Sequence, residues 1–185
     1  SNNTVGGVLL SEGNIIAGNV HNGVSILQGS GNVITNNYIG VGVDGETPLA
    51  NGEDGVLIDS GSLNTIGGFY LKGGNVISAN ASCGGGSGIN ISSGSSAVIE
   101  DNTITGNRLL CVGAVAGGGI RVDVGASAVI RGNTITDNGD SLTPGGGIAL
   151  MSPADVVIEK NIIRGNTASD GGGILLYKAG AYDWD

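Results

Sequence analysis

Two carboxylates and one guanidinium at repeated positions are the strongest candidates for chemistry in this chain of 185 residues. Asp59, Arg121 and Asp123 each lie two or four residues after a recurring glycine. A carboxylate pair beside an arginine is the kind of group that a polysaccharide lyase or a glycosidase uses. If the protein is an enzyme, these three residues are its predicted catalytic group, and Asn90 and Ser92 complete a polar surface cluster around them.

The acidic loop that runs from residue 44 to residue 54, DGETPLANGED, offers a second kind of chemistry. Its carboxylates are those of Asp44, Glu46, Glu53 and Asp54. Calcium prefers six to eight oxygen ligands, so four carboxylates near one corner make a weak calcium candidate. The spacing fits neither an EF-hand nor a calcium-binding nonapeptide repeat, and the alternative is a solvated loop without a metal.

The two cysteines of the chain, Cys83 and Cys111, occupy equivalent loops of successive repeats. Neighbouring repeats that stack would bring them within disulfide distance. We therefore predict a Cys83–Cys111 bridge and an oxidising compartment, with two free thiols as the alternative. The sequons that begin at Asn2, Asn80 and Asn90 carry little weight, because such matches arise by chance in an Asn- and Ser-rich chain.

An internal repeat of about thirty residues must position all of these side chains. A glycine followed by alternating apolar residues recurs at Gly23, Gly55, Gly88, Gly119, Gly147 and Gly173. A second apolar stretch places Ile34, Ile66, Ile99, Ile130 and Ile158 eleven residues after each of the first five glycines. Three short strands per repeat, each with a period of two, are typical of a three-faced solenoid. We predict one all-β domain over residues 1–185, a single-stranded parallel β-helix of six to seven coils whose crossovers should be right-handed.

Asparagines and charges also recur at fixed positions of the repeat. Asn37, Asn102, Asn133 and Asn161 share one position, and Asn107, Asn138 and Asn166 share another. We expect both sets at corners, where asparagine tolerates the left-handed backbone region and its amide can bond along a column. Glu100, Arg131 and Glu159 should form a column of alternating charge on a second face.

The units AVIEDNTITGN, AVIRGNTITDN and VVIEKNIIRGN resemble the parallel β-helix repeats of pectate-lyase-like proteins. The segments NTIGG, GNVISAN and NNYIGVGVDG are similar to repeats of large secreted bacterial surface proteins. The resemblance covers essentially the whole chain and implies the fold. It implies no single activity, because the superfamily includes lyases, hydrolases, epimerases, adhesins and phage tailspikes.

Composition narrows the functional classes. The net charge of −9 with only seven basic residues argues against nucleic-acid binding, and no apolar run is long enough to insert into a membrane. The few cations and the 3% of aromatic residues also count against uronate and neutral-sugar grooves. We expect a non-catalytic structural protein, extracellular or on a cell surface, without a cofactor. A polysaccharide-binding or polysaccharide-degrading enzyme is the alternative.

The two ends of the sequence fall near the same phase of the repeat. On that basis we expect a segment of a longer β-helix or a subunit that stacks end to end into a filament. The expected partners are copies of itself or adjoining coils, and surface glycans are a further candidate.

Overall fold

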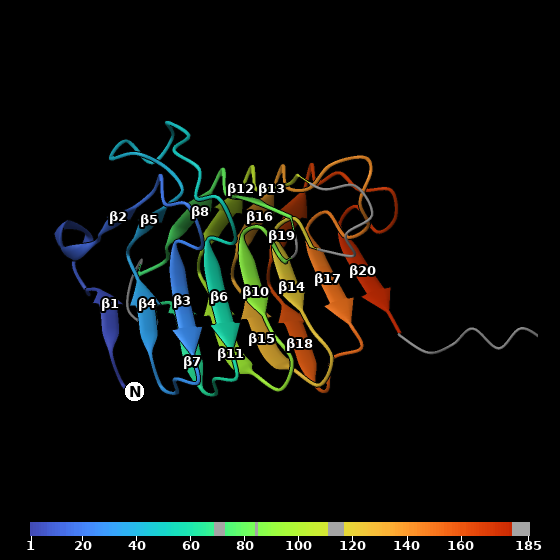
Figure 1. Cartoon of the computed structure of the whole chain (residues 1–185), viewed down its shortest axis with the longest axis horizontal. Helices are drawn as coiled ribbons and strands as arrows, with labels where there is room; N and C mark the ends of the chain where they lie inside the picture. The colour runs from blue at the N-terminus through green and yellow to red at the C-terminus, as the bar shows by residue number, and fades with distance from the viewer. Residues whose placement is uncertain (69–72, 84, 111–116, 179–185) are drawn as a thin grey trace, which may run out of the picture.

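The computed structural model describes residues 1–68, 73–83, 85–110 and 117–178, and places nearly all of their regular structure in parallel β-sheet (Figure 1). Sheet A consists of β1 (Thr4–Gly6), β4 (Val33–Thr35), β7 (Asn64–Gly67), β11 (Ser96–Glu100), β15 (Ser127–Arg131) and β18 (Val156–Glu159). Sheet B consists of β2 (Ile15–Ile16), β5 (Tyr38–Ile39), β8 (Val76–Ser78), β12 (Thr103–Thr105), β16 (Thr134–Thr136) and β19 (Ile162–Arg164). Sheet C consists of β3 (Val24–Leu27), β6 (Val56–Asp59), β10 (Ile89–Ile91), β14 (Ile120–Val122), β17 (Ile148–Met151) and β20 (Ile174–Tyr177).

The chain visits sheets A, B and C in turn and then begins the next coil. Each sheet therefore gains one strand per coil, and the chain completes about five turns between β1 and β18. A short pair, β9 (Ala81–Ser82) with β13 (Arg108–Leu109), extends two coils between sheets B and C. The six to seven coils expected from the sequence correspond to six rungs within the described residues. The single described helix is the 3₁₀ turn η1 (Leu10–Glu12), and no described helix could cross a bilayer.

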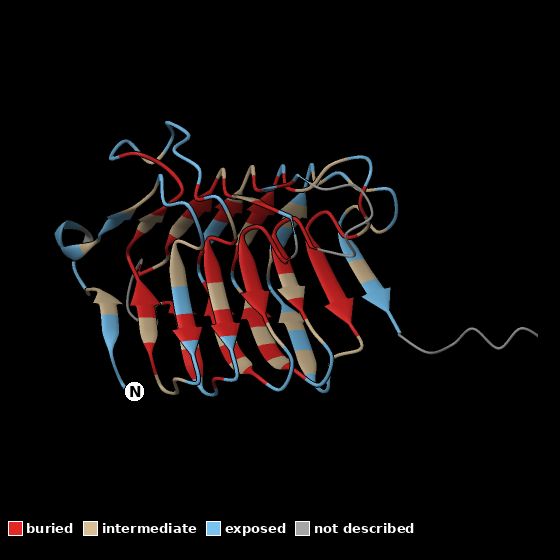
Figure 2. Cartoon of the chain, in the orientation of Figure 1, coloured by how far each residue is buried: buried red, intermediate tan, exposed pale blue. Residues whose placement is uncertain are grey.

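The inward side chains stack in the columns that the repeat predicts. In sheet A, Ile34, Ile66, Ile99 and Ile130 pair directly with one another across successive strands, and each is fully buried. Equivalent columns run through sheets B and C, so the core is a continuous aliphatic interior (Figure 2). Burial alternates along strands such as β6, β14 and β15, whereas β10 and β17 are buried throughout, and the outermost rungs are the most exposed.

Asparagine side chains cross-link the rungs along the axis. In one ladder each Nδ2 donates to the Oδ1 one rung later, through Asn14, Asn37, Asn75, Asn102, Asn133 and Asn161. A second ladder runs through Asn19, Asn51, Asn80, Asn107, Asn138 and Asn166. A third, shorter ladder joins Asn3, Asn32 and Asn64 and stops where Ala97 occupies the equivalent position. The two predicted columns are thus confirmed as hydrogen-bonded ladders.

The corner geometry differs from our expectation in one respect. The left-handed residue is the one that precedes the ladder asparagine, as at Asn36, Asp101 and Lys160, with φ of 58°, 58° and 56°. Among the described residues no asparagine of the two long ladders has a positive φ. The left-handed residue turns the chain, and the asparagine that follows then points inward with its amide aligned along the axis. Asparagine is therefore selected here for its side-chain bonds rather than for its backbone tolerance.

Candidate functional site

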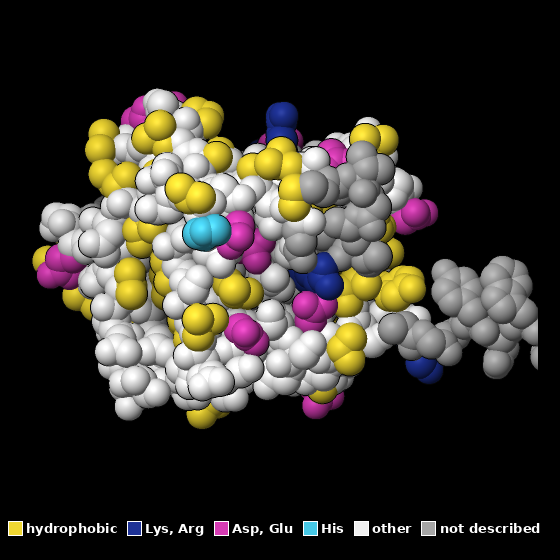
Figure 3. Space-filling model, in the orientation of Figure 1, with side chains coloured by type: hydrophobic (Ala, Val, Ile, Leu, Met, Phe, Trp, Pro, Cys, Tyr) yellow, Lys and Arg dark blue, Asp and Glu magenta, His cyan; other side chains and the backbone are white. Residues whose placement is uncertain are grey.

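The outer face of sheet C carries the polar cluster predicted from the sequence. Ile58, Ile91 and Val122 are in register, so the residues that follow them, Asp59, Ser92 and Asp123, lie on three consecutive rungs. Asn90 pairs with Arg121 in the adjacent outward column. This face looks toward the viewer in Figure 1, and Figure 3 shows acidic side chains gathered over it beside a histidine.

The three candidate catalytic residues do not converge on one point. Nε and Nη2 of Arg121 donate to Oδ1 of Asp123 at 3.0 and 2.8 Å, and solvent reaches less than a fifth of either side chain. Asp59 lies two rungs away, roughly 10 Å at about 4.8 Å per rung, and its Oδ1 accepts a hydrogen bond from its neighbour Ser60 at 3.1 Å. The guanidinium is thus engaged by one carboxylate and remote from the other.

A hollow of about 400 Å³ opens beside this cluster, between the loop that precedes β6 and the strands β9 and β10. Leu57 supplies an apolar surface. The polar residues of the lining are Asn22, Glu53, Asp54, Ser82, Asn90 and Ser92. The lining therefore presents hydroxyl, amide and carboxylate groups around a small apolar surface.

Asp54 and Asn90 form a buried, hydrogen-bonded pair in this lining. Nδ2 of Asn90 donates to Oδ2 of Asp54 at 3.0 Å, and the two residues are 7% and 4% exposed. Burial, the largest influence, raises the pKa of the Asp54 carboxyl, while hydrogen bonds from Asn90 and Ser82 act in the opposite direction. Sequence reasoning treated Asp54 only as a loop carboxylate. Its place directly before the recurring Gly55 was the available signal that it enters the wall of the coil.

The four carboxylates of the acidic loop are engaged separately. Asp44 accepts hydrogen bonds from the backbone N–H groups of Glu46 and Thr47 at 3.0 and 2.9 Å and from the Thr47 hydroxyl, which together lower its pKa to about 2. Glu53 bonds the ring of His21 at 3.1 Å, one coil away. Within the described residues, no three His, Cys, Asp or Glu side chains are grouped so as to hold a metal ion. Calcium binding by this loop stays a prediction of the sequence.

The structure describes one of the two cysteines of the predicted disulfide. Cys83, which lines the hollow, is disulfide-bonded. Its predicted partner, Cys111, lies outside the described residues. The asparagines of the three sequons differ in solvent exposure. Asn2 is exposed, whereas Asn80 is fully buried in an asparagine ladder and Asn90 is buried and bonded to Asp54.

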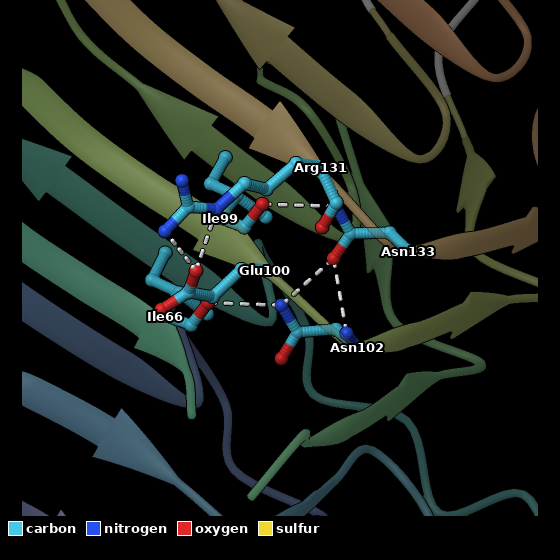
Figure 4. Close-up of polar contacts among 6 residues, drawn as sticks. All are labelled: Ile66, Ile99, Glu100, Asn102, Arg131 and Asn133. Atoms are coloured by element: carbon cyan, nitrogen blue, oxygen red, sulfur yellow. Dashed lines mark hydrogen bonds and ion pairs between the residues drawn. The ribbon is translucent and has the colours of Figure 1, made fainter. Parts of the chain in front are cut away.

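On the outer face of sheet A the charged column has the predicted register. Arg131 pairs with Glu100 on one side and with Glu159 on the other. Nε and Nη2 of Arg131 both donate to Oε2 of Glu100, at 2.8 and 2.6 Å, directly beside the Asn102–Asn133 bond (Figure 4). The hydrogen bond to Glu100, together with its negative charge, raises the pKa of the arginine, and Glu100 is only 4% exposed. This ion pair cross-links two rungs on the outside as the ladders do on the inside.

Comparison with known proteins supports the fold and assigns no activity. The model of a protein family described as "Right handed beta helix region" matches residues 12–182. No curated protein and no solved structure matches the chain. A match over nearly the whole chain, together with three parallel sheets that grow by one strand per coil, places the protein in the right-handed β-helix family.

Proposed function

We propose that the protein is a non-catalytic structural β-helix that acts outside the cell, as an adhesin-like surface segment or as a filament subunit. The observation that carries this proposal is the pair of asparagine ladders, which link all six rungs by side-chain hydrogen bonds. Much of the buried polar side-chain surface is thus used to stiffen a rod. In a low-dielectric interior such connected networks rigidify and specify one structure.

Two further observations agree with this role. The candidate catalytic group is divided, because Arg121 is engaged by Asp123 while Asp59 lies two rungs away. The disulfide bond at Cys83 suits an oxidising, extracellular setting. At the first rung a hollow of about 330 Å³ reaches Ile26 of the core and the partly buried Val5 and Val24, and this surface supports packing against further coils, of the same chain or of another copy.

Two measurements test the structural proposal. A panel of acidic and neutral polysaccharides should remain uncleaved by the purified protein. Cleavage that the Asp123→Ala variant abolishes, in a protein that still folds, would overturn the proposal. Electron microscopy separates the two structural versions: filaments support a self-assembling subunit, whereas isolated monodisperse rods support a segment of a surface protein.

Glycan binding is a second candidate, favoured by the hollow on sheet C. Its volume of about 400 Å³ falls within the range of small-molecule sites, and its hydroxyls, amides and carboxylates suit sugar hydroxyls. A glycan array with the wild-type protein and the Ser92→Trp variant tests it, since a tryptophan there would fill the hollow. Ser127→Trp, on the outer face of sheet A, is the matched control and should bind as the wild type does. Equal binding by all three proteins would exclude this site.

A further inference from the structure

The hydrogen-bond pattern at Asp54 and Asn90 is incomplete in an informative way. One bond joins the pair, from Nδ2 of Asn90 to Oδ2 of Asp54 at 3.0 Å. The other oxygen of each side chain, Oδ1 in both residues, is buried and has no hydrogen-bond partner among the described residues. Both of these atoms are acceptors when Asp54 is ionised, and each would then be buried at a substantial cost.

One proton removes both defects. If Oδ1 of Asp54 carries a hydrogen, the acid becomes a donor, and the Asn90 carbonyl oxygen is a buried acceptor that lacks one. The Nδ2 of Asn90 already donates to the remaining acid oxygen. A carboxylic acid and an amide pair in this two-bond, head-to-head manner without any net charge. We propose that Asp54 is held as a neutral acid against the Asn90 amide, and that this pair is a pH-sensitive latch on the wall of the sheet C hollow.

The charges around the pair do not supply an alternative partner. Glu53, the preceding residue, carries a negative charge that disfavours ionisation of Asp54 and is itself bonded to His21. The positive charge of Arg121, on β14, favours ionisation of Asp54, but it is the weakest of the influences on the pKa of Asp54. The Arg121 guanidinium also bonds Asp123. Burial outweighs these effects and raises the pKa of Asp54. The outward carboxylate of Asp59, on β6, is exposed and accepts a hydrogen bond from Ser60.

The latch acts on the segment that carries Cys83. A Cβ built on Gly85 would lie 2.5 Å from Oδ2 and 2.7 Å from Oδ1 of Asp54, so the backbone there rests directly on the carboxyl group. The Ser82 hydroxyl bonds the same carboxyl. When Asp54 loses its proton, an anion lies beneath this backbone, and the segment must move to admit water. The hollow on sheet C should therefore loosen as the pH rises.

The sign of the linkage follows from the raised pKa. Because the carboxyl pKa is higher in the folded state than the ordinary 3.8, the folded protein binds this proton more tightly than the unfolded chain. The stabilising contribution is complete below about pH 3.8 and is lost as the pH rises through the folded-state pKa.

The Asp54→Asn variant tests the latch directly, because an amide at residue 54 can both donate to Asn90 Oδ1 and accept from Asn90 Nδ2 without titrating. We expect the wild-type protein to lose thermal stability as the pH rises from 4 to 8, and Asp54→Asn to remove that loss. Asp59→Asn, at the exposed end of the following strand β6, is the matched control and should keep the wild-type pH profile.

A second readout observes the proton itself. In protein labelled with ¹³C at aspartate carboxyls, the infrared C=O stretch of a protonated acid should persist to a higher pH in the wild type than in Asp54→Asn, because the pKa of Asp54 is raised above the ordinary 3.8. The proposal is overturned if Asp54 titrates at or below its ordinary pKa, or if Asp54→Asn shares the wild-type pH profile. It is equally overturned if Asp54→Asn fails to fold, since an amide pair should reproduce both bonds.

Discussion

The side-chain amide of Asn102 joins three successive rungs of the solenoid. Its Nδ2 donates to the carbonyl oxygen of Ile66, one rung earlier, at 2.9 Å and to Oδ1 of Asn133, one rung later, at 3.0 Å (Figure 4). Its Oδ1 accepts from both the backbone N–H and the Nδ2 of Asn75 at 2.9 Å. Four hydrogen bonds on one buried amide make this position a sensitive probe of what holds the coils together.

Replacing Asn102 with alanine should destabilise the fold by about 2–4 kcal/mol, because several buried partners lose their hydrogen bonds together. Asn102→Asp should be at least as destabilising, since the donor is replaced by an acceptor that faces two other oxygens. Chemical denaturation measures both. Asn14→Ala, at the exposed end of the same ladder, should cost about 1 kcal/mol or less. Equal losses at the two positions would contradict the ladder as a source of stability.

Removing the cation from the Glu100–Arg131 pair should leave a buried carboxylate without a counter-charge. We therefore expect Arg131→Met to lower the melting temperature, and the double variant with Glu100→Gln to recover part of that loss. Thermal unfolding at neutral pH measures the cycle. Arg164→Met, at an exposed position of sheet B, is the control and should change little. If the single and double variants have the same melting temperature, Glu100 and Arg131 do not stabilise the fold as a pair.

The Asp44 carboxyl should titrate with a pKa of about 2, because the Thr47 hydroxyl and two backbone N–H groups bond its ionised form. Since the folded pKa lies below the ordinary 3.8, the stabilising contribution is present above about pH 3.8 and is lost as the pH falls through about 2. A ¹³C carboxyl titration by NMR checks the value. Thr47→Val removes the largest of these influences and should move the pKa back toward 3.8.

Peptide mapping without reduction should recover Cys83 joined to Cys111, the one other cysteine of the sequence. The bridge would close a loop of about 28 residues, and its removal in Cys83→Ser/Cys111→Ser should cost roughly 3–4 kcal/mol of stability. Chains that run as covalent dimers without reductant would show instead that the bridge joins two molecules.

The sequence by itself determined the coil. Aliphatic residues with a period of two inside a repeat of about thirty can be buried only by stacking, and this requirement fixes the inward columns, their register and the outward face of Asp59, Asn90 and Asp123. It also identified the asparagine columns, although Asn75 escaped notice as a ladder member because its coil contains an insertion. The insertion changes the spacing of Asn75 in the sequence, but the strands still stack in register, so Asn75 lies in the ladder.

Only the tertiary structure decided which polar side chains meet. Asp54 and Asn90 are 36 residues apart and lie at different phases of the repeat, and they meet in the wall of the hollow on sheet C. The same holds for the ion pair between Arg121 and Asp123 and for the left-handed residue that precedes the long-ladder asparagine at most corners. Burial and hydrogen bonding of polar groups depend on loop paths, and those paths follow from packing around the coil rather than from its period.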